Sequence, residues 1–354
     1  MRTGVSIVIP SWNGLDLLKR YLPSVIAAAS HYREYAGARV EVIVVDDAST
    51  DATSDWLTAR GFDGSAAAGA LSATANGLVF RLIRSSENRG FGDACNRGVA
   101  AAEHPLVFLL NNDVEPDVGS IRPLAENFAD PSVFAVHCRV FEVESGRECG
   151  TGKVGGFSRG FIRVHQSYRP KASSNGAGEV QSAAEAGFYS MFAGGGSAMF
   201  DREKFLGLGG FEPLLSPFYW EDVELSYRAW KRGYTVLYEP RSITHHRVSS
   251  TIGKFRRGPV RRIEQRNRLL FHWINLHDAG LMQSHLRWLI VLALTAPFRL
   301  RPRFVASCLA AMKMLRRVRE RRREEQRAAV RDDRQIMAMF DDLKRRSDLH
   351  VFDG

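Results

Sequence analysis

The amino-acid sequence predicts an α/β protein in which a mostly parallel sheet is flanked by helices and followed by a helical extension at the C-terminus. Two observations support this prediction. In the first 110 residues, four near-continuously apolar runs alternate with segments of helical spacing, a pattern typical of parallel strands covered on both faces. From about residue 260 onward, the spacing of apolar residues indicates helices.

The elements can be assigned in chain order. Four buried strands are expected, at 5–10, 40–45, 79–83 and 105–110. Helices are expected between them, at 15–29, 51–60 and 92–102. Beyond residue 130 the pattern loosens, and the expected elements are strands at 133–143, 160–164 and 234–238 with a helix inside 218–232. The last fifteen or so residues are expected to be poorly packed.

Charge is distributed unevenly along the 354 residues, whose formal net charge is +10. Residues 247–354 carry 25 basic and 11 acidic side chains, which points to an anionic partner such as a nucleic acid or a membrane surface. Residues 311–335 contain no aromatic side chain for base stacking, so nucleic acid is not expected. Apolar runs alternate with arginines over 281–315, which favours an element lying on anionic lipid. A helical subdomain packed on the core and a dimer-forming helix remain alternatives.

The cysteine content and the length of the apolar runs indicate in which cell compartment the protein is expected. None of the four cysteines forms a CxxC pair, so a disulfide framework is not expected and a reducing cytosol fits best. The longest apolar stretch, 288–298, is about half of the roughly 20 residues that a spanning helix needs. We therefore expect a cytoplasmic protein without a transmembrane helix, with peripheral attachment to the inner face of the cell membrane as the further option.

Polar residues follow all four predicted strands. Ligands of parallel sheets bind beyond the carboxyl ends of the strands, and there the sequence has Ser11-Trp12-Asn13, Asp46-Asp47, Glu87-Asn88-Arg89-Gly90 and Asn111-Asn112-Asp113. Each could simply form a turn or cap a helix. Together they indicate a cleft suited to a base, a ribose and a metal ion. The sequence has no GxxxxGK[ST] loop, and 89–92 is too short for a dinucleotide fingerprint, which disfavours P-loop ATPases and Rossmann dehydrogenases.

Two further segments carry ionisable groups. Glu221-Asp222 follows three aromatic residues at the start of the expected helix in 218–232. Acidic residues favour helix N-termini for purely structural reasons, but a carboxylate beside Tyr219 and Trp220 faces desolvation, which raises its pKa and suits a general base. Beyond the strand at 234–238 comes His245-His246. Such a histidine is often structural, and near a diphosphate and an aspartate it is a candidate metal ligand.

The order of these segments resembles a known family. VSIVIPSWN, VVDDASTD, ENRGFGDACNRG, LLNND, FYWEDVELSYRAWKRGY and HHRVSST follow one another as in family 2 glycosyltransferases of the Rossmann-like GT-A fold. The chain looks most similar to the bacterial branch with rhamnosyl- and galactofuranosyl-type transferases of surface polysaccharides. The resemblance covers roughly residues 4–255. It implies a catalytic domain at 1–255 and a basic helical extension at 256–354.

The resemblance also implies roles for individual residues. Trp12 would stack on the nucleobase, and Asp47 with Asp46 would contact the edge of the base. The expected nucleotide-sugar site consists of Pro10, Trp12, Asn13, Asp46, Asp47, Asn88, Gly90, Asn96 and Asn112. Asp113 ends a DxD-like motif that here reads Asn111-Asn112-Asp113, so a single carboxylate is left to bind metal. His246 matches a second metal ligand, with His245 as its rival.

The reaction that the resemblance implies is an inverting transfer from a UDP- or dTDP-sugar to a hydroxyl of a glycan or lipid-linked glycan, with Mg²⁺ or Mn²⁺ as cofactor. Asp222, in the pair with Glu221, corresponds to the catalytic base. Arg228 could add positive charge near the diphosphate, or it could be a surface residue of the helix. A nucleotidyltransferase is an alternative, disfavoured because the first loop has no basic residue before Lys19. A non-catalytic nucleotide-sugar-binding homologue is another, disfavoured by the presence of both Asp113 and Asp222.

Overall fold

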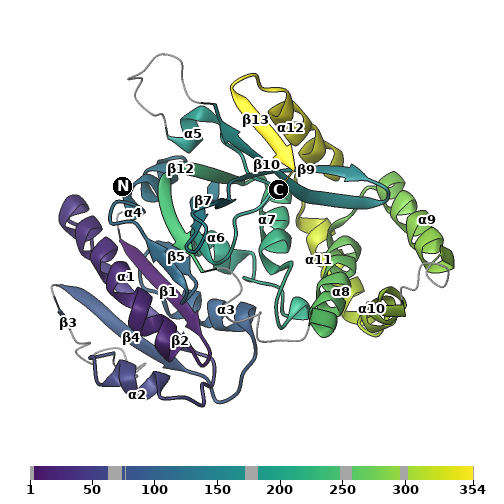
Figure 1. The fold of residues 1–354 in the computed structure, drawn as a ribbon. Coiled ribbons are helices and arrows are strands. Elements are labelled where there is room, and N and C mark those ends of the chain that lie inside the picture. The colour runs from purple at the N-terminus through teal and green to yellow at the C-terminus, as the bar shows by residue number, and fades with distance from the viewer. Residues whose placement is uncertain are drawn as a thin grey trace.

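The computed structural model describes residues 4–62, 74–75, 77–171, 182–247, 257–295 and 302–353 (Figure 1). Within these ranges, ten strands form a mixed sheet with the order β3-β4-β2-β1-β5-β11-β7-β12-β6, in which β8 pairs with β7. Its strands are β1 (Val5–Ser11), β2 (Val40–Asp46), β3 (Thr74–Ala75), β4 (Leu78–Arg84), β5 (Leu106–Leu110), β6 (Val114–Pro116), β7 (Val133–Glu142), β8 (Glu148–Gly150), β11 (Ser197–Asp201) and β12 (Thr235–His246). A second, antiparallel sheet contains β9 (Gly152–Ser158), β10 (Phe161–Pro170) and β13 (Leu349–Asp353).

The N-terminal half of the large sheet is parallel. β4, β2, β1 and β5 run side by side in the same direction, and each lies within one residue of its predicted bounds. Every residue of β1 and β2 is buried, as expected for apolar parallel strands covered on both faces. The carboxyl ends of these strands therefore meet at one edge, where the polar segments of the sequence follow them.

The helices of this half are α1 (Leu15–Ala36), α2 (Thr53–Thr58) and α3 (Phe91–Ala101). α1 extends beyond the predicted end at 29 because Tyr32 continues its buried stripe, and Gly37 ends it in the left-handed conformation with φ of 58°. The predicted helix at 92–102 is confirmed as α3. The α/β class predicted from the first 110 residues is thus confirmed.

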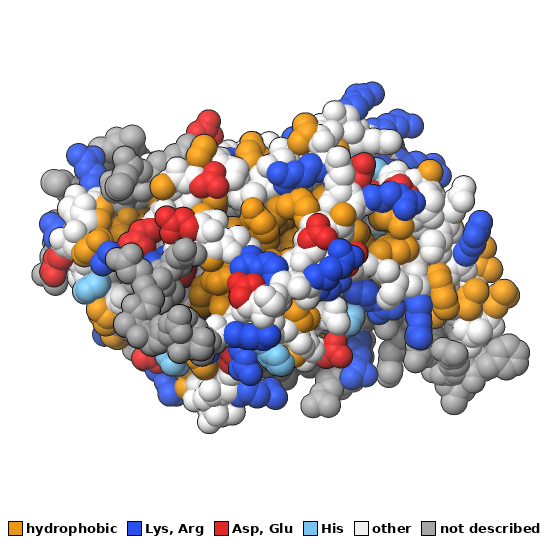
Figure 2. All heavy atoms as spheres, turned by 90° about the horizontal axis from the view of Figure 1, so that it is seen from above, with side chains coloured by type: hydrophobic (Ala, Val, Ile, Leu, Met, Phe, Trp, Pro, Cys, Tyr) orange, Lys and Arg blue, Asp and Glu red, His pale blue; other side chains and the backbone are white. Residues whose placement is uncertain are grey.

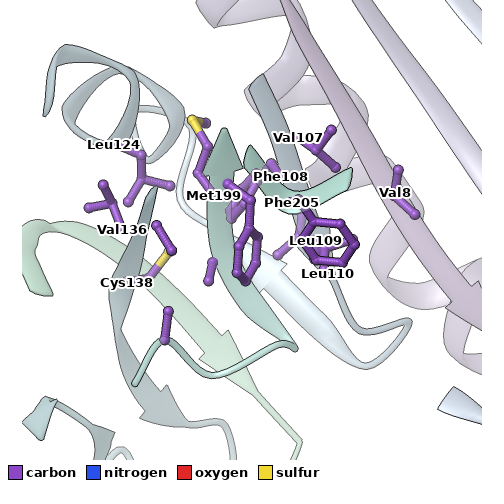
Figure 3. Close-up of a cluster of buried hydrophobic side chains, with 14 of the residues drawn as sticks. Val8, Val107, Phe108, Leu109, Leu110, Leu124, Val136, Cys138, Met199 and Phe205 are labelled. Atoms are coloured by element: carbon purple, nitrogen blue, oxygen red, sulfur yellow. The ribbon is translucent and has the colours of Figure 1, made fainter. Parts of the chain in front are cut away.

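The C-terminal half of the sheet contains antiparallel pairs. β11 lies between β5 and β7 and is antiparallel to both, while β12 is parallel to β7. The shorter helices here are α4 (Ile121–Glu126), η1 (Asn127–Ala129), α5 (Ala183–Ala186), α6 (Arg202–Gly207) and η2 (Pro213–Leu215). In the core around β5, β11 and β7, Phe108, Leu124, Val136, Met199 and Phe205 are fully buried (Figure 3).

Helices dominate the rest of the chain. They are α7 (Glu221–Lys231), α8 (Arg257–Asn275), α9 (Ala279–Thr295), α10 (Pro302–Met312), α11 (Leu315–Ala328) and α12 (Asp333–Arg345). The expectation of a poorly packed C-terminus is wrong. β13 pairs with β10, and α12 beside it buries Ile336 and Phe340 (Figure 1). Ile336, Phe340 and Leu343 form an apolar stripe at helical spacing, opposite a charged face, so the sequence did carry the signal of an amphipathic helix here.

An apolar surface remains at the end of the molecule formed by α9 and α10. Leu286, Ile290 and Leu294 lie at successive turns of α9, and their exposed fractions are 49%, 60% and 68%. On α10, Leu309 is 55% exposed. Figure 2 shows hydrophobic side chains gathered at the right-hand end, where α9 lies in Figure 1. In the described part of the chain, no helix has the length and apolar character required to span a bilayer.

Candidate active site

A cavity of about 950 Å³ opens at the carboxyl ends of β1, β2 and β5 and reaches the start of α7. Its size lies in the range of about 300–1,000 Å³ that is typical of ligand pockets. Ten of the predicted site residues line it: Pro10, Trp12, Asp47, Asn88, Gly90, Asn112, Asp113, Glu221, Asp222 and His246. Segments more than 200 residues apart in the sequence thus meet at one site.

Two predicted nucleotide-binding residues, Asn13 and Asp46, do not line the cavity. Asn13 Oδ1 accepts hydrogen bonds from the backbone N–H groups of Thr50, at 2.7 Å, and Asp51, at 3.3 Å. Asp46 Oδ1 accepts one from the N–H of Ser49 at 2.9 Å. Both side chains therefore fix the loop after β2, which is the turn-forming alternative that the sequence allowed.

Asn96 also has a structural position. It joins α3 to the chain before η2, because its Oδ1 accepts from the N–H of Phe211 at 2.8 Å and its Nδ2 donates to the carbonyl of Phe211 at 2.9 Å. It does line a smaller cavity of about 370 Å³ next to the main one. Asn88 and Glu221 line both cavities.

Asp47 lines the cavity and also holds the loop before α3. Its carboxylate accepts hydrogen bonds from the N–H groups of Arg89, at 3.2 Å, and Gly90, at 2.8 Å. Gly90 has φ of 92°, and a Cβ atom there would lie 2.8 Å from the carbonyl oxygen of Pro217. Only glycine fits this close approach. The loop after β4 is therefore packed directly against the segment that precedes α7.

Asp113 and His246 form a pair on the cavity wall. β6 and β12 are antiparallel with Val114 opposite His246, which brings the imidazole Nε2 to 3.1 Å from Asp113 Oδ1. Successive side chains of a strand alternate between faces, so His245 points elsewhere and its Nε2 lies 3.1 Å from Asp117 Oδ1. Of the two histidines that the sequence left open, only His246 lines the cavity.

The Asp113–His246 pair fits a divalent cation in its chemistry. Carboxylate oxygen is a preferred ligand of Mn²⁺ and Mg²⁺, and imidazole nitrogen is a common ligand of first-row transition metals. Among the described residues there is no cluster of three or more His, Cys, Asp or Glu side chains that could hold a metal. The pair therefore offers two protein ligands, and a diphosphate and water would have to complete the coordination, as is common for Mg²⁺ at phosphate sites.

Glu221 and Asp222 form a second acidic site, at the first turn of α7. Burial raises the pKa of Asp222 to about 6, while backbone hydrogen bonds, including one from Val223 N–H at 2.8 Å, oppose the shift. Burial and the neighbouring charge of Asp222 raise the pKa of Glu221 to about 8. Carboxyl groups with separated pKa values can divide acid and base roles. Both carboxyl groups of the pair therefore keep their protons to a higher pH than ordinary acids do.

Both roles that the sequence allowed for Arg228, a positive charge near the diphosphate and a surface residue of the helix, are wrong. It is fully buried and does not line the cavity. Its guanidinium forms an ion pair with Glu224 at 2.7 Å and donates to the carbonyl of Gly210 at 2.6 Å. Because α7 is covered by other elements, the side chain of Arg228 reaches neither the protein surface nor the cavity. It ties α7 to the turn after α6.

Sequence reasoning missed part of the cavity wall. Phe218 and Tyr219, which precede Glu221, line it, and so do three residues of α8, Pro259, Val260 and Ile263. The aromatic residues carried a signal because they flank the acidic pair. The residues of α8 carried none, since isolated apolar side chains at the start of a helix are ordinary core or surface positions.

The fold and this cavity agree with the expected class, a glycosyltransferase, and comparison with known proteins establishes the family. The model of "Glycosyl transferase family 2" matches residues 6–202, more than half of the chain. A model of "Glycosyl transferase family group 2" matches residues 106–318. The chain therefore belongs to glycosyl transferase family 2, and the family predicted from its motifs is confirmed.

Among similar proteins are two curated relatives. The "Succinoglycan biosynthesis protein ExoO" of Rhizobium meliloti (strain 1021) is 34% identical over 115 residues, which are 32% of this chain and 27% of that protein. The "Putative polypeptide N-acetylgalactosaminyltransferase 13" of Drosophila melanogaster is 29% identical over 174 residues, 48% of this chain and 29% of that protein. The matched segments span less than a third of either relative.

Solved structures share the fold at low identity. GalNAc-T7 with UDP, GalNAc and Mn²⁺ has a TM-score of 0.53 at 17% identity, covering 81% of this chain and 54% of that one. Residues 1–349 of S. aureus TarS in complex with UDP-GlcNAc have a TM-score of 0.53 at 13% identity, covering 96% and 91%. These likenesses confirm the predicted GT-A type of sheet with flanking helices and a helical C-terminal part.

Proposed function

We propose that this glycosyltransferase transfers a sugar with inversion from a UDP- or dTDP-sugar to a hydroxyl group, using Mg²⁺ or Mn²⁺. The observation that carries the proposal is the meeting of two acidic sites in one cavity, the Asp113–His246 pair and the Glu221–Asp222 pair. One suits a diphosphate with its cation, and the other suits proton transfer. A single displacement at the anomeric carbon is favoured by a base for the acceptor proton and by stabilisation of the leaving diphosphate.

Asp222 is the general base of the proposed reaction. Its carboxylate would accept the proton of the acceptor hydroxyl as that oxygen attacks the anomeric carbon. A pKa of about 6 keeps it ionised at neutral pH while making it a stronger base than an ordinary aspartate. Glu221, with a pKa of about 8, would keep its proton and donate a hydrogen bond to a substrate oxygen.

Asp113 and His246 would hold the divalent cation. When bound, the cation supplies a Lewis acid that neutralises the charge developing on the leaving nucleoside diphosphate. Trp12, Asp47 and Asn88 line the same cavity. We assign them to the nucleoside, with the indole of Trp12 stacked on the base.

We further propose that the acceptor is a glycan or lipid-linked glycan of a bacterial surface polysaccharide, glycosylated at the inner face of the cell membrane. The exposed apolar residues of α9 and α10 support this, together with the exposed basic side chains Arg287, Lys313 and Arg317 near them in the chain. Apolar helices flanked by basic residues are suited to an anionic lipid surface. The matched succinoglycan biosynthesis protein favours the same class of acceptor.

A donor panel tests the proposal. Purified protein would be incubated with UDP-, dTDP- and GDP-sugars and with Mn²⁺ or Mg²⁺, with and without a bacterial lipid extract, and release of nucleoside diphosphate would be measured. Release from one donor that depends on metal, is lost in Asp222→Asn and is kept in Asp117→Asn is the expected result. Asp117 is a matched control because it lies outside the cavity. Formation of a nucleotide sugar from a nucleoside triphosphate and a sugar phosphate would instead identify a nucleotidyltransferase.

A further inference from the structure

The segment that carries Asp222 into the cavity has an unfavourable backbone. Tyr219 and Trp220, directly before α7, both lie in the left-handed region, with φ of 73° and 74°. Bulky residues rarely adopt this conformation, and it persists only where the surroundings enforce it. Trp220 is the residue before the first turn of α7, and its side chain makes no capping hydrogen bond. Something other than the local sequence must therefore hold the 215–220 loop in place.

A buried amide on α8 supplies that restraint. Asn267 is fully buried. Its Nδ2 lies 2.5 Å from the carbonyl oxygen of Leu215 and 2.9 Å from each of those of Phe218 and Tyr219. The amide NH2 group has two N–H donors, and three carbonyls of the loop share them. A buried amide whose N–H groups are all bonded to one loop fixes the path of that loop, because breaking these bonds would leave buried polar groups without partners.

Arg266 holds this amide in its orientation. Its Nε and Nη2 donate to Asn267 Oδ1 at 2.9 Å and 2.7 Å, and Nη2 also donates to the carbonyl of Ser216. Since Oδ1 is occupied by the guanidinium, Nδ2 has to face the loop carbonyls. On the far side of the same loop, Ser216 Oγ donates to the carbonyl of Arg89 at 2.9 Å, and the carbonyl of Pro217 accepts from the N–H of Phe91 at 3.2 Å. The loop is therefore clamped between α8 and the segment before α3.

From this geometry we infer that Asn267 is a positioning residue of the transfer reaction, which holds the 215–220 loop so that Asp222 faces the acceptor. The inference rests on the proposed role of Asp222 as base. It makes α8 part of the catalytic unit, although the sequence suggested that this unit ends at residue 255. The cavity wall formed by Pro259, Val260 and Ile263 of the same helix is consistent with that.

The test compares two buried asparagines of α8. Asn275 is also fully buried, but its Nδ2 contacts Glu224 Oε1 at 3.1 Å and the carbonyl of Phe271 at 3.3 Å rather than the loop. Asn267→Ala and Asn275→Ala would be compared by Tm, by the Kd of the nucleoside diphosphate and by kcat with the donor found in the panel. We expect similar losses of Tm and Kd values within about threefold of wild type. kcat should fall about 10- to 100-fold only in Asn267→Ala, because a small displacement of a catalytic group is costly.

Arg266→Met keeps the inference testable if Asn267→Ala does not fold, since Arg266 is partly exposed. It should lower kcat about 3- to 10-fold with the nucleotide Kd unchanged, because Asn267 keeps its donors but loses the partner that orients them. Equal kcat values in Asn267→Ala and Asn275→Ala, or an unchanged kcat in Arg266→Met, would overturn the inference. If Asp222→Asn is itself fully active, the proposed function fails instead, so the two failures are distinguishable.

Discussion

Asp113 and Asp222 line the same cavity, but the side chains next to them differ: Asp113 lies beside a histidine and Asp222 beside a second carboxyl group. Asp113 follows a central strand and lies 3.1 Å from the imidazole of His246. Asp222 and Glu221 begin a helix in aromatic surroundings, and among the described residues neither takes part in an ion pair. A carboxylate beside an imidazole suits a bound cation. Two neighbouring carboxyl groups without a basic partner have raised pKa values, which suits proton transfer. The difference assigns each site its chemistry.

Removing the base should have the largest effect. Asp222→Asn keeps the shape of the side chain but cannot accept a proton, so kcat should fall by about 10²–10⁴-fold, the usual contribution of a positioned base. Glu221→Gln is the matched comparison, because glutamine resembles the protonated acid that the pKa of about 8 predicts. It should change kcat by less than about tenfold. Initial rates at saturating donor check both values, and equal losses in the two variants would contradict the division of roles.

The cation site should show the next largest effect. Chelation of metal, Asp113→Asn and His246→Ala should each lower the rate by about 100-fold, since Lewis-acid stabilisation of the leaving group contributes several kcal/mol. His245→Ala is the neighbouring control and should leave the rate near that of wild type, because His245 contacts Asp117 outside the cavity. Rates measured against Mn²⁺ concentration test this. A larger loss in His245→Ala than in His246→Ala would reverse the ligand assignment.

The pH profile should separate the two carboxyl groups of the Glu221–Asp222 pair. Burial raises both pKa values, so each carboxyl group loses its proton at a higher pH than an ordinary acid does. Activity needs ionised Asp222 and should fall about tenfold per pH unit below pH 6. It should also fall above about pH 8, where Glu221 loses its proton. The profile of kcat in Glu221→Gln should keep the acid limb and lose the alkaline one. A profile that stays flat from pH 5 to pH 7 would exclude Asp222 as the base.

The apolar surface of α9 should contribute to membrane binding and not to the rate of sugar transfer. Ile290→Asp with Leu294→Asp should weaken binding to vesicles containing anionic lipid by about tenfold or more, because both side chains are largely exposed. Release of nucleoside diphosphate without lipid should not change. Val118→Asp is a matched control, since Val118 is also about half exposed but belongs to the N-terminal part of the chain. Equal vesicle binding by all variants in a flotation assay would contradict the membrane proposal.

Local pattern was enough to predict the parallel half of the fold, because the strands of this half are continuous apolar runs and their polar ends meet at one edge. It was not enough to distinguish residues that face the cavity from those that hold it together. Asn13, Asp46 and Asp47 are all polar residues after a strand, and all three accept hydrogen bonds from backbone N–H groups. Of the three, only Asp47 also lines the cavity. Asn267 could not be predicted, since its role depends on a contact between segments about 50 residues apart.

In the C-terminal helices too, contacts between distant segments could not be predicted from the sequence. The amphipathic stripe of α12 can be recognised in the sequence, but the contacts of Asp333 with another segment cannot. This residue is fully buried, and its carboxylate contacts Lys231 Nζ at 2.8 Å and the hydroxyl of Tyr227 at 2.7 Å. Long-range pairs of this kind are set by tertiary packing and leave no periodic signal in either segment.

Binding of Mn²⁺ in the presence of the preferred nucleoside diphosphate tests the separation of the two acidic sites most directly. Calorimetric titration of wild type, Asp222→Asn and Asp113→Asn would give the Mn²⁺ Kd of each complex. We predict that Asp222→Asn binds Mn²⁺ like wild type although transfer is lost, and that Asp113→Asn binds it at least about tenfold more weakly. Loss of Mn²⁺ binding in Asp222→Asn, or unchanged binding in Asp113→Asn, would contradict the account.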